Sequence, residues 1–83
     1  MKLTVRYFAS LREALGASEA LDLPAGITVA GVRDALIARG GAHAGALARS
    51  RMLRSALNQV LCDEAMAVPE GAELAFFPPV TGG

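Results

Sequence analysis

The sequence has one cysteine and one histidine in 83 residues, and this scarcity limits the kinds of site that the chain can build. Cys62 has no partner for an internal disulfide, which fits a protein of the reducing cytosol. No base lies near Cys62 in the sequence, so we expect a small, half-buried side chain rather than a thiolate nucleophile. We expect His43, in a stretch rich in Gly and Ala, to be an exposed loop residue. One Cys and one His give no spacing of metal ligands, so we predict no metal site.

The chain also lacks an excess of charge, a long apolar run and a phosphate loop. Eight basic and eight acidic residues cancel, which argues against binding to nucleic acid or to an anionic membrane. No apolar run approaches the roughly 18 residues of a membrane span, and the first residues alternate like a strand instead of forming a signal peptide. Gly40-Gly41 is not followed by Lys and Ser or Thr, as a phosphate loop would be. We predict a cytoplasmic protein whose partners are small molecules or other proteins.

Basic residues are absent after Arg54, and every charged residue beyond it is acidic. These carboxylates could be ordinary solvated side chains, or they could form an acidic face for a basic partner. Both interpretations remain open at this point. The residues concerned are Asp63, Glu64, Glu70 and Glu73.

Hydrophobic residues, in contrast, make up 53% of the sequence. A chain of this length can bury one core and is too short for two. We therefore predict a single domain over residues 1–83, with residues 78–83 as a protruding C-terminal tail.

Alternating apolar residues predict the strands. Leu3, Val5 and Tyr7 share one face of a first strand over residues 3–8, and residues 19–23 form its antiparallel hairpin partner. Residues 55–61 alternate as a third strand, in which either face could be the core face. After a turn at residues 69–71, a last strand has Leu74 and Phe76 on one face.

Helical patterns lie between these strands. Residues 28–39 give the best helix, with Thr28 as N-cap and Gly40 as C-cap. Its predicted inner face excludes Arg33 and Asp34 and consists of Val29, Val32, Leu36 and Ile37. A short helix over residues 11–15 is expected to begin at a Ser10 cap and to end at Gly16. Residues 41–51 are interpreted as a loop followed by a second short helix.

This order of elements predicts an α+β domain. We expect a mixed sheet of four to five strands with one main crossing helix and short extra helices, which is the layout of a β-grasp (ubiquitin-like) domain. The first and last strands would be parallel neighbours in the middle of the sheet. The C-terminal tail would then leave the domain from its central strand.

The tail is the best candidate for a functional site, because no catalytic set is present elsewhere. Gly82 and Gly83 lack Cβ atoms, so this end can thread a narrow channel and place an unhindered carboxylate inside another protein. Pro78 and Pro79 fix φ and stiffen the exit from the last strand. A frayed terminus is the alternative.

The C-terminal sequence F-F-P-P-V-T-G-G resembles the end of the small, sulfur-carrier subunit of molybdopterin synthases (MoaD-type). Ala72 departs from that family, which often has Asp there. The resemblance spans the chain, and its other matching residues are Val5, Tyr7-Phe8-Ala9, Leu11-Arg12-Glu13, Gly16, Ala56-Leu57-Asn58-Gln59, Gly71 and Glu73.

This resemblance implies a protein co-substrate that is no enzyme by itself and binds no cofactor. An E1-like adenylyltransferase would use ATP to adenylate the Gly83 carboxylate, and a sulfur donor would convert the adenylate to a thiocarboxylate. The tail, from Pro78 and Pro79 through Val80, Thr81 and Gly82, would then enter the large catalytic subunit, in an expected heterotetramer. There the thiocarboxylate would donate sulfur to cyclic pyranopterin monophosphate for molybdenum cofactor biosynthesis.

The resemblance also implies that Phe8, Leu61 and Phe77 line an apolar contact with the large subunit. The alternative is that Phe8 and Phe77 fill the far end of the core. The same Gly-Gly end would serve a sulfur carrier of thiamine, cysteine or tRNA-thiolation routes, or a ubiquitin-like protein modifier. A plain interaction domain remains a further alternative, in which Gly83 has no role.

Overall fold

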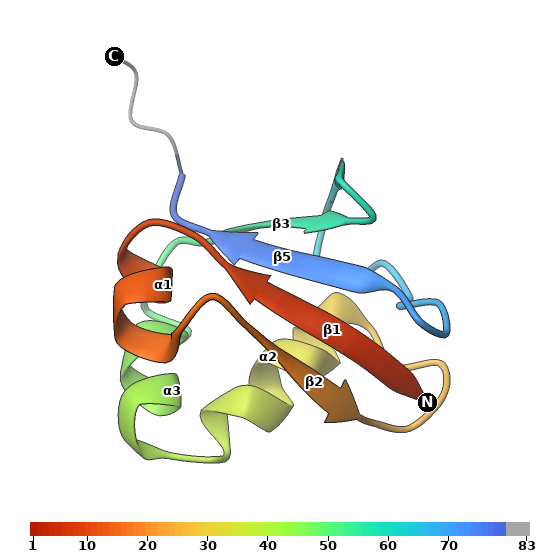
Figure 1. Cartoon of the computed structure of the whole chain (residues 1–83), viewed down its shortest axis with the longest axis horizontal. Coiled ribbons are helices and arrows are strands. Elements are labelled where there is room, and N and C mark those ends of the chain that lie inside the picture. The colour runs from red at the N-terminus through yellow and green to blue at the C-terminus, as the bar shows by residue number, and fades with distance from the viewer. Residues whose placement is uncertain (80–83) are drawn as a thin grey trace.

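The structure, a computed structural model, describes residues 1–79 of the chain. Five strands form one sheet in the order β2-β1-β5-β3-β4. Strand β1 runs parallel to β5, and the other neighbouring pairs are antiparallel. Figure 1 shows β5 between β1 and β3, with the helices gathered on one side of the sheet. The elements are β1 Lys2–Tyr7, α1 Ser10–Leu15, β2 Ser18–Asp22, α2 Val29–Ile37, α3 Gly41–Ala46, β3 Arg54–Leu57, β4 Val60–Cys62 and β5 Glu73–Phe77.

This architecture confirms the predicted α+β fold with a mixed sheet and one main crossing helix. The alternation of β1 buries one side of the strand, and Leu3, Val5 and Tyr7 are almost fully enclosed. Val5 pairs with Leu74 and Tyr7 with Phe76 across the parallel ladder, so the inner faces of the two strands join. The predicted parallel pairing of the first and last strands is confirmed.

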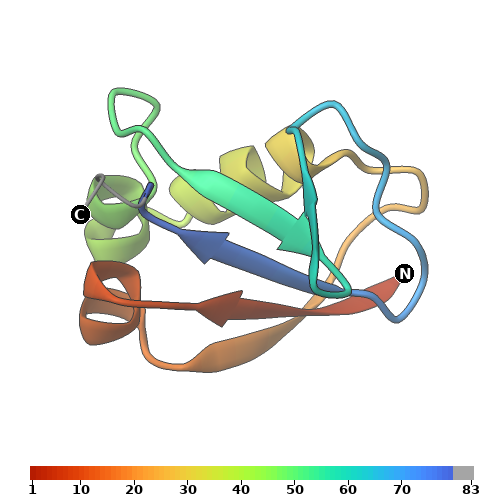
Figure 2. The same ribbon diagram turned by 90° about the horizontal axis from the view of Figure 1, so that it is seen from above.

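Helix α2 covers this inner face. Its N-cap is Thr28, as predicted, and the Thr28 hydroxyl accepts a hydrogen bond from the Gly31 amide at 3.1 Å. Figure 2 shows the helix crossing behind the strands. The helix ends at Ile37, earlier than expected, and Gly40, with φ 73°, is the N-cap of α3 instead of the C-cap of α2. The side chains that α2 buries against the sheet include Val29, Val32 and Leu36.

The segment after α2 differs from its prediction. Residues 41–51 were expected to be a loop followed by a helix, but α3 begins at once at Gly41 and the loop follows it. Gly and Ala side chains carry little periodic pattern, so contacts outside the segment decide its structure. Ala46 and Leu47 are buried in the core, and these contacts hold the short helix in place.

The first short helix also begins differently from its prediction. Ser10 is the first helical residue and not the cap. Ala9 holds the cap position with φ 53° and makes no side-chain hydrogen bond. Gly16, with φ 92°, ends the helix as predicted, because its amide bonds the Arg12 carbonyl and a side chain at this φ would be strained.

The predicted third strand over residues 55–61 is wrong, because the chain reverses within it. Asn58 and Gln59 have φ of 48° and 70°, which is the conformation of a two-residue hairpin turn between β3 and β4. The Asn58 side chain accepts a hydrogen bond from the Glu73 amide at 3.0 Å, and the Asn58 amide donates to the Glu73 carbonyl. The hairpin is thereby fastened to the start of β5.

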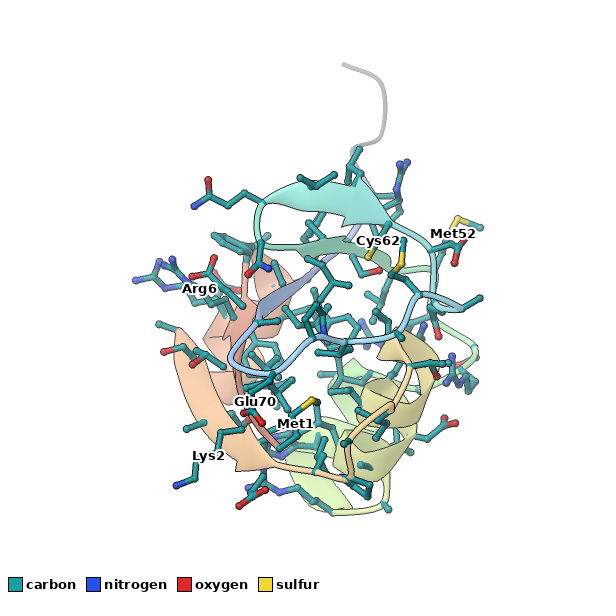
Figure 3. All side chains as sticks on the ribbon, turned by 90° about the vertical axis from the view of Figure 1, so that its right-hand side faces the viewer. Met1, Lys2, Arg6, Met52, Cys62 and Glu70 are labelled. Atoms are coloured by element: carbon teal, nitrogen blue, oxygen red, sulfur yellow. The ribbon has the colours of Figure 1, made fainter. Side chains whose placement is uncertain are left out.

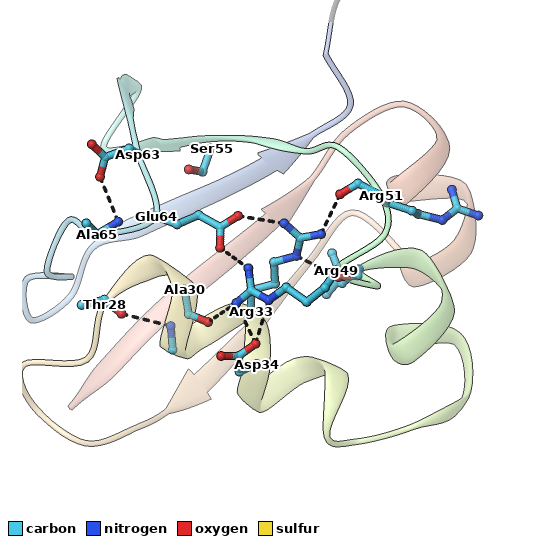
Figure 4. Close-up of polar contacts among 12 residues, drawn as sticks. Thr28, Ala30, Arg33, Asp34, Arg49, Arg51, Ser55, Asp63, Glu64 and Ala65 are labelled. Atoms are coloured by element: carbon cyan, nitrogen blue, oxygen red, sulfur yellow. Dashed lines mark hydrogen bonds and ion pairs between the residues drawn. The ribbon is translucent and has the colours of Figure 1, made fainter.

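Arg33 was predicted to lie outside the inner face of α2, but its side chain is buried with 3% exposure. Its guanidinium donates to the carbonyls of Leu47, Ala48 and Arg51 and to the Glu64 carboxylate, at 2.6 to 2.9 Å. Figure 4 shows the contacts with Arg51 and Glu64. The side chain therefore satisfies the backbone of the loop that leads into β3, which would otherwise bury unpaired carbonyls.

Glu64 completes this cluster from the segment after β4. It bonds Arg33 and Arg49, and Arg49 also bonds Asp34 (Figure 4). Burial opposes the ionisation of Glu64, but the hydrogen bonds from Arg49 and Arg33 outweigh it and hold the Glu64 pKa below its ordinary value. Arg33 is buried, whereas Arg49 is about half exposed at 45%.

A second polar cluster joins β1, β2, α3 and the link between α2 and α3, and it corrects the prediction for His43. His43 lies on α3 and is partly buried, with its Nε2 2.8 Å from Glu19. Glu19 also accepts hydrogen bonds from Tyr7 and Arg39. Burial opposes ionisation of Glu19, but the bonds from His43, Arg39 and Tyr7 outweigh it and lower the Glu19 pKa to about 2. Burial, followed by the bond to Glu19, raises the pKa of the Tyr7 hydroxyl.

No helix within residues 1–79 is both long and apolar enough to cross a membrane.

Candidate docking face and tail exit

The sheet has a second face, opposite the helices, which we call the outer face. The strand registers define it, since residues that alternate with the core residues point away from the core. Ala56 and Ala75 lie at its centre and are 8% and 9% exposed, because larger side chains stand around them. The outer face consists of Lys2, Thr4 and Arg6 of β1, Ser18, Ala20 and Asp22 of β2, Arg54 and Ala56 of β3, Leu61 of β4, and Glu73, Ala75 and Phe77 of β5.

Large apolar side chains gather at one end of the outer face. Phe77 ends β5 and is half-buried, and Phe8, which follows β1, is 39% exposed. Tyr7 pairs with Phe76, so Phe8 and Phe77 occupy the next position along two parallel neighbours. Neither ring belongs to the buried core cluster, which contradicts the alternative that they fill the far end of the core.

Leu61 reaches the same face from the edge strand β4 and is 61% exposed. It pairs with Ala56, and Ala56 pairs with Ala75, so the three side chains form a row across the sheet. The β3–β4 hairpin, which the sequence pattern did not predict, therefore carries Leu61 onto the face that holds Phe77. The structure brings the three predicted interface residues to one side of the sheet.

The predicted tail begins where β5 ends. Pro78 and Pro79 follow Phe77 directly and are both half-buried. Val80, Thr81, Gly82 and Gly83, which complete the predicted site, lie outside the described residues. Because β5 is flanked by β1 and β3, the chain leaves the strand from the interior of the sheet and not from an edge.

The sequence pattern assigned no role to two arginines of the outer face. The Arg6 guanidinium lies 5.6 Å from the centre of the Phe8 ring and 3.7 Å from the Glu73 carboxylate. Arg54 is exposed and pairs with Phe77 across the β3–β5 ladder. The alternation of the first strand places Lys2, Thr4 and Arg6 on the face opposite Leu3, Val5 and Tyr7 but indicates no role for Arg6, whereas Arg54 stands before the predicted strand and gave no signal.

Cys62 is half-buried at the edge of the sheet, as predicted. Its sulfur lies 3.7 Å from the Ser55 hydroxyl, and the Ser55 hydroxyl donates to the Cys62 carbonyl at 3.2 Å. An open groove runs beside it, lined by apolar Leu53, Leu61 and Met66 and by charged Arg54, Asp63 and Glu64. Figure 3 shows Cys62 and Met52 on this side of the domain and Arg6 on another side, pointing away from it.

The mixed sheet, the crossing helix and the terminal strand at its centre define a ubiquitin-like β-grasp domain. The ThiS family model matches residues 5–83, and the chain belongs to this family.

Known relatives carry a more specific name. The molybdopterin synthase sulfur carrier subunit of Haemophilus influenzae is 43% identical over 82 residues, and the Escherichia coli protein of the same name is 40% identical over 84 residues. Each comparison covers 98% of this chain and 99% of the relative. The recognised resemblance to the small subunit of molybdopterin synthase is thus confirmed.

The chain is also similar to a solved structure of an archaeal protein. SAMP1, the small archaeal modifier protein 1 of Haloferax volcanii, is 30% identical, with a TM-score of 0.77 and full coverage of both chains. The same fold therefore occurs in a relative named as a protein modifier.

Proposed function

We propose that this chain is the sulfur carrier subunit of a molybdopterin synthase, and that the Gly83 carboxylate carries the sulfur. The observation that supports this most directly is the match, over 98% of the chain, to two relatives of that name. The sequence F-F-P-P-V-T-G-G after the central strand agrees with it. The proposed place of action is the cytoplasm.

The proposed reaction requires only a free C-terminal carboxylate from this chain. An E1-like adenylyltransferase joins the Gly83 carboxylate to the AMP part of ATP and releases pyrophosphate. A sulfur nucleophile from a donor then attacks the acyl carbon, and AMP leaves with the bonding electron pair. The resulting thiocarboxylate is the nucleophile that supplies sulfur to cyclic pyranopterin monophosphate in the large subunit.

The domain itself acts as a holder and not as a catalyst. The side chain of Arg33 bonds backbone carbonyls, and the side chains around Glu19 bond one another. An adenylate or thiocarboxylate is lost to hydrolysis in bulk water, so the tail must react inside a closed channel of a partner. Pro78 and Pro79 limit the conformations that the tail loses on entering such a channel.

The docking surface we propose for the large subunit is the aromatic end of the outer face. Phe8, Leu61 and Phe77 are exposed or half-buried apolar side chains beside the exit of the tail. Aromatic anchors at the centre of an interface carry much of its binding energy. We expect two small and two large subunits to form the heterotetramer that the family resemblance implies.

Replacing Phe77 with Ala tests this surface, and the adjacent Phe76 is a matched control. Phe77→Ala is expected to weaken binding to the large subunit by about 2 kcal/mol, or roughly 30-fold in Kd. Phe76 is buried in the core, so Phe76→Ala is expected to cost about 3–5 kcal/mol of folding free energy. Calorimetric titration and urea unfolding measure the two effects. Unfolding of the Phe77→Ala variant would instead show that Phe77 is a core residue and contradict the proposed docking surface.

Mass spectrometry of the protein from cells tests the proposed function. A sulfur carrier is expected to gain the mass difference between sulfur and oxygen at its C-terminal residue, in cells that contain the activating enzyme. The similarity to SAMP1 makes a protein modifier the second candidate, and a modifier would appear as conjugates to lysines of other proteins. Conjugates without any thiocarboxylate would reject the sulfur-carrier proposal.

A further inference from the structure

We propose that Arg6 and Arg54 make the docking face selective for a partner that carries carboxylates around an apolar centre. This inference rests on the proposed function, since the partner concerned is the large subunit of molybdopterin synthase. It specifies that the large subunit presents negative charge beside the apolar contact.

Arg6 is held in place on the outer face. Its guanidinium lies over the Phe8 ring at 5.6 Å and pairs with Glu73 at 3.7 Å, and the Arg6 side chain is 43% exposed. A 3.7 Å pair at this exposure is weak, so Glu73 only partly neutralises Arg6. The stacking on Phe8 leaves N–H donors free to meet a carboxylate of the partner.

Arg54 stands on the other side of the central strand. It pairs with Phe77 across the β3–β5 ladder, so the two side chains share the outer face, and Arg54 is exposed. Within residues 1–79, no carboxylate forms an ion pair with Arg54. Arg54 therefore lies beside Phe77, and Arg6 lies beside Ala75, two residues earlier in β5, on the opposite flanking strand.

Most carboxylates that could give this surface the opposite charge are bound by other groups or lie away from Phe77. Glu64 is engaged by Arg33 and Arg49, and Glu70 accepts a hydrogen bond from the Lys2 amide. On the outer face, Asp22 pairs in register with Lys2, at the end of the sheet away from Phe77. Asp63 lines the groove that Arg54 also lines and accepts a hydrogen bond from the Ala65 amide, and Glu73 pairs with Arg6. The position in register with Phe77 on β3 is nevertheless basic, because Arg54 occupies it.

Charges at the rim of an interface act mainly on the rate of association and on its dependence on salt. At low salt an attractive pair of charges raises the association rate, and added salt screens the effect. Selectivity through Arg6 and Arg54 should therefore appear in the association rate constant more than in the dissociation rate constant.

The test measures association of the full-length chain with the large subunit of the same organism's synthase, by stopped flow, at several salt concentrations. Neutralising both residues, in R6Q combined with R54Q, is expected to lower the association rate constant about 5- to 10-fold at low salt. The difference should shrink at high salt. Lysines in both positions, R6K with R54K, should restore most of the rate, because they keep the charge.

The control neutralises Lys2 by Lys2→Gln, since Lys2 lies on the same face at the far end of β1. Lys2→Gln should change the rate by less than about 2-fold. Equal rates and equal salt dependence for wild type and the double neutral variant would overturn this inference and leave the proposed function intact. If the wild-type chain does not bind the large subunit at all, the proposed function fails, and this inference fails with it. Thermal unfolding of each variant shows that the fold is retained.

Discussion

Deletion of Gly83 is expected to abolish sulfur transfer while the domain remains folded. The shortened chain still ends in a glycine carboxylate, so the chemistry of the terminal group is unchanged. Its position changes by one residue, or about 3.5 Å along an extended chain. A reacting group misplaced by about 1 Å can already cost 100-fold in rate, so we expect a loss of at least about 100-fold.

The measurement is conversion of cyclic pyranopterin monophosphate by the reconstituted synthase, with thiocarboxylate formation followed separately by mass spectrometry. Thr81→Ser is the matched control, because it alters the tail without changing its length and should retain most of the transfer. The buried core cluster ends at Phe76, so the unfolding midpoint of the deletion variant should equal that of the wild type. Full activity after deletion would remove Gly83 from the proposed chemistry and favour a plain interaction domain.

Replacing Arg33 with Ala is expected to cost about 3–5 kcal/mol of folding free energy. The guanidinium bonds three backbone carbonyls and Glu64 from a nearly closed site, and the variant leaves these carbonyls without their donor. A domain of this size is stable by roughly 4–12 kcal/mol, so the loss is a large share of the total. Urea unfolding at neutral pH measures it.

Arg49 provides the control for Arg33, because it bonds the same Glu64 from a half-exposed position. Arg49→Ala is expected to cost less than about 1 kcal/mol, as do most exposed ion pairs. Equal losses for the two variants would mean that water replaces the Arg33 guanidinium at the carbonyls. The loss of Arg33 would also affect the docking face. Arg33 holds the loop that leads into β3, and Arg54 is the first residue of β3.

Local patterns were enough to predict the frame of this fold. Alternation in β1 and β5, the Thr28 cap and the turn at Gly71 each depend on residues close together in the sequence, and the structure agrees with them. The pairing of the first and last strands followed from their order around one crossing helix. The tail residues beyond Pro79 remain a prediction from their motif, and so does the partner role of Phe8, Leu61 and Phe77.

The errors arose where distant contacts decide the structure. Asn58 and Gln59 do not form the Asn-Gly pair that marks a tight hairpin, and the turn is fixed by bonds from Asn58 to Glu73. Arg33 was expected on a polar face, but it is buried. Its partners are carbonyls 14 to 18 residues further along the chain, which the local pattern of the helix does not reveal. His43 was expected in solvent, but its partner Glu19 lies on β2, 24 residues earlier in the chain.

The central position of β5 has a mechanical consequence for the proposed insertion of the tail into a partner. Tension on the tail acts along β5, which is hydrogen-bonded to β1 on one side and to β3 on the other. Both ladders are then loaded in shear, so their hydrogen bonds share the force, instead of opening one after another as they would when an edge hairpin is peeled away. Under the proposed function, the domain could thus be pulled by its C-terminal tail, and the tail withdrawn after each transfer, without the strands separating one hydrogen bond at a time.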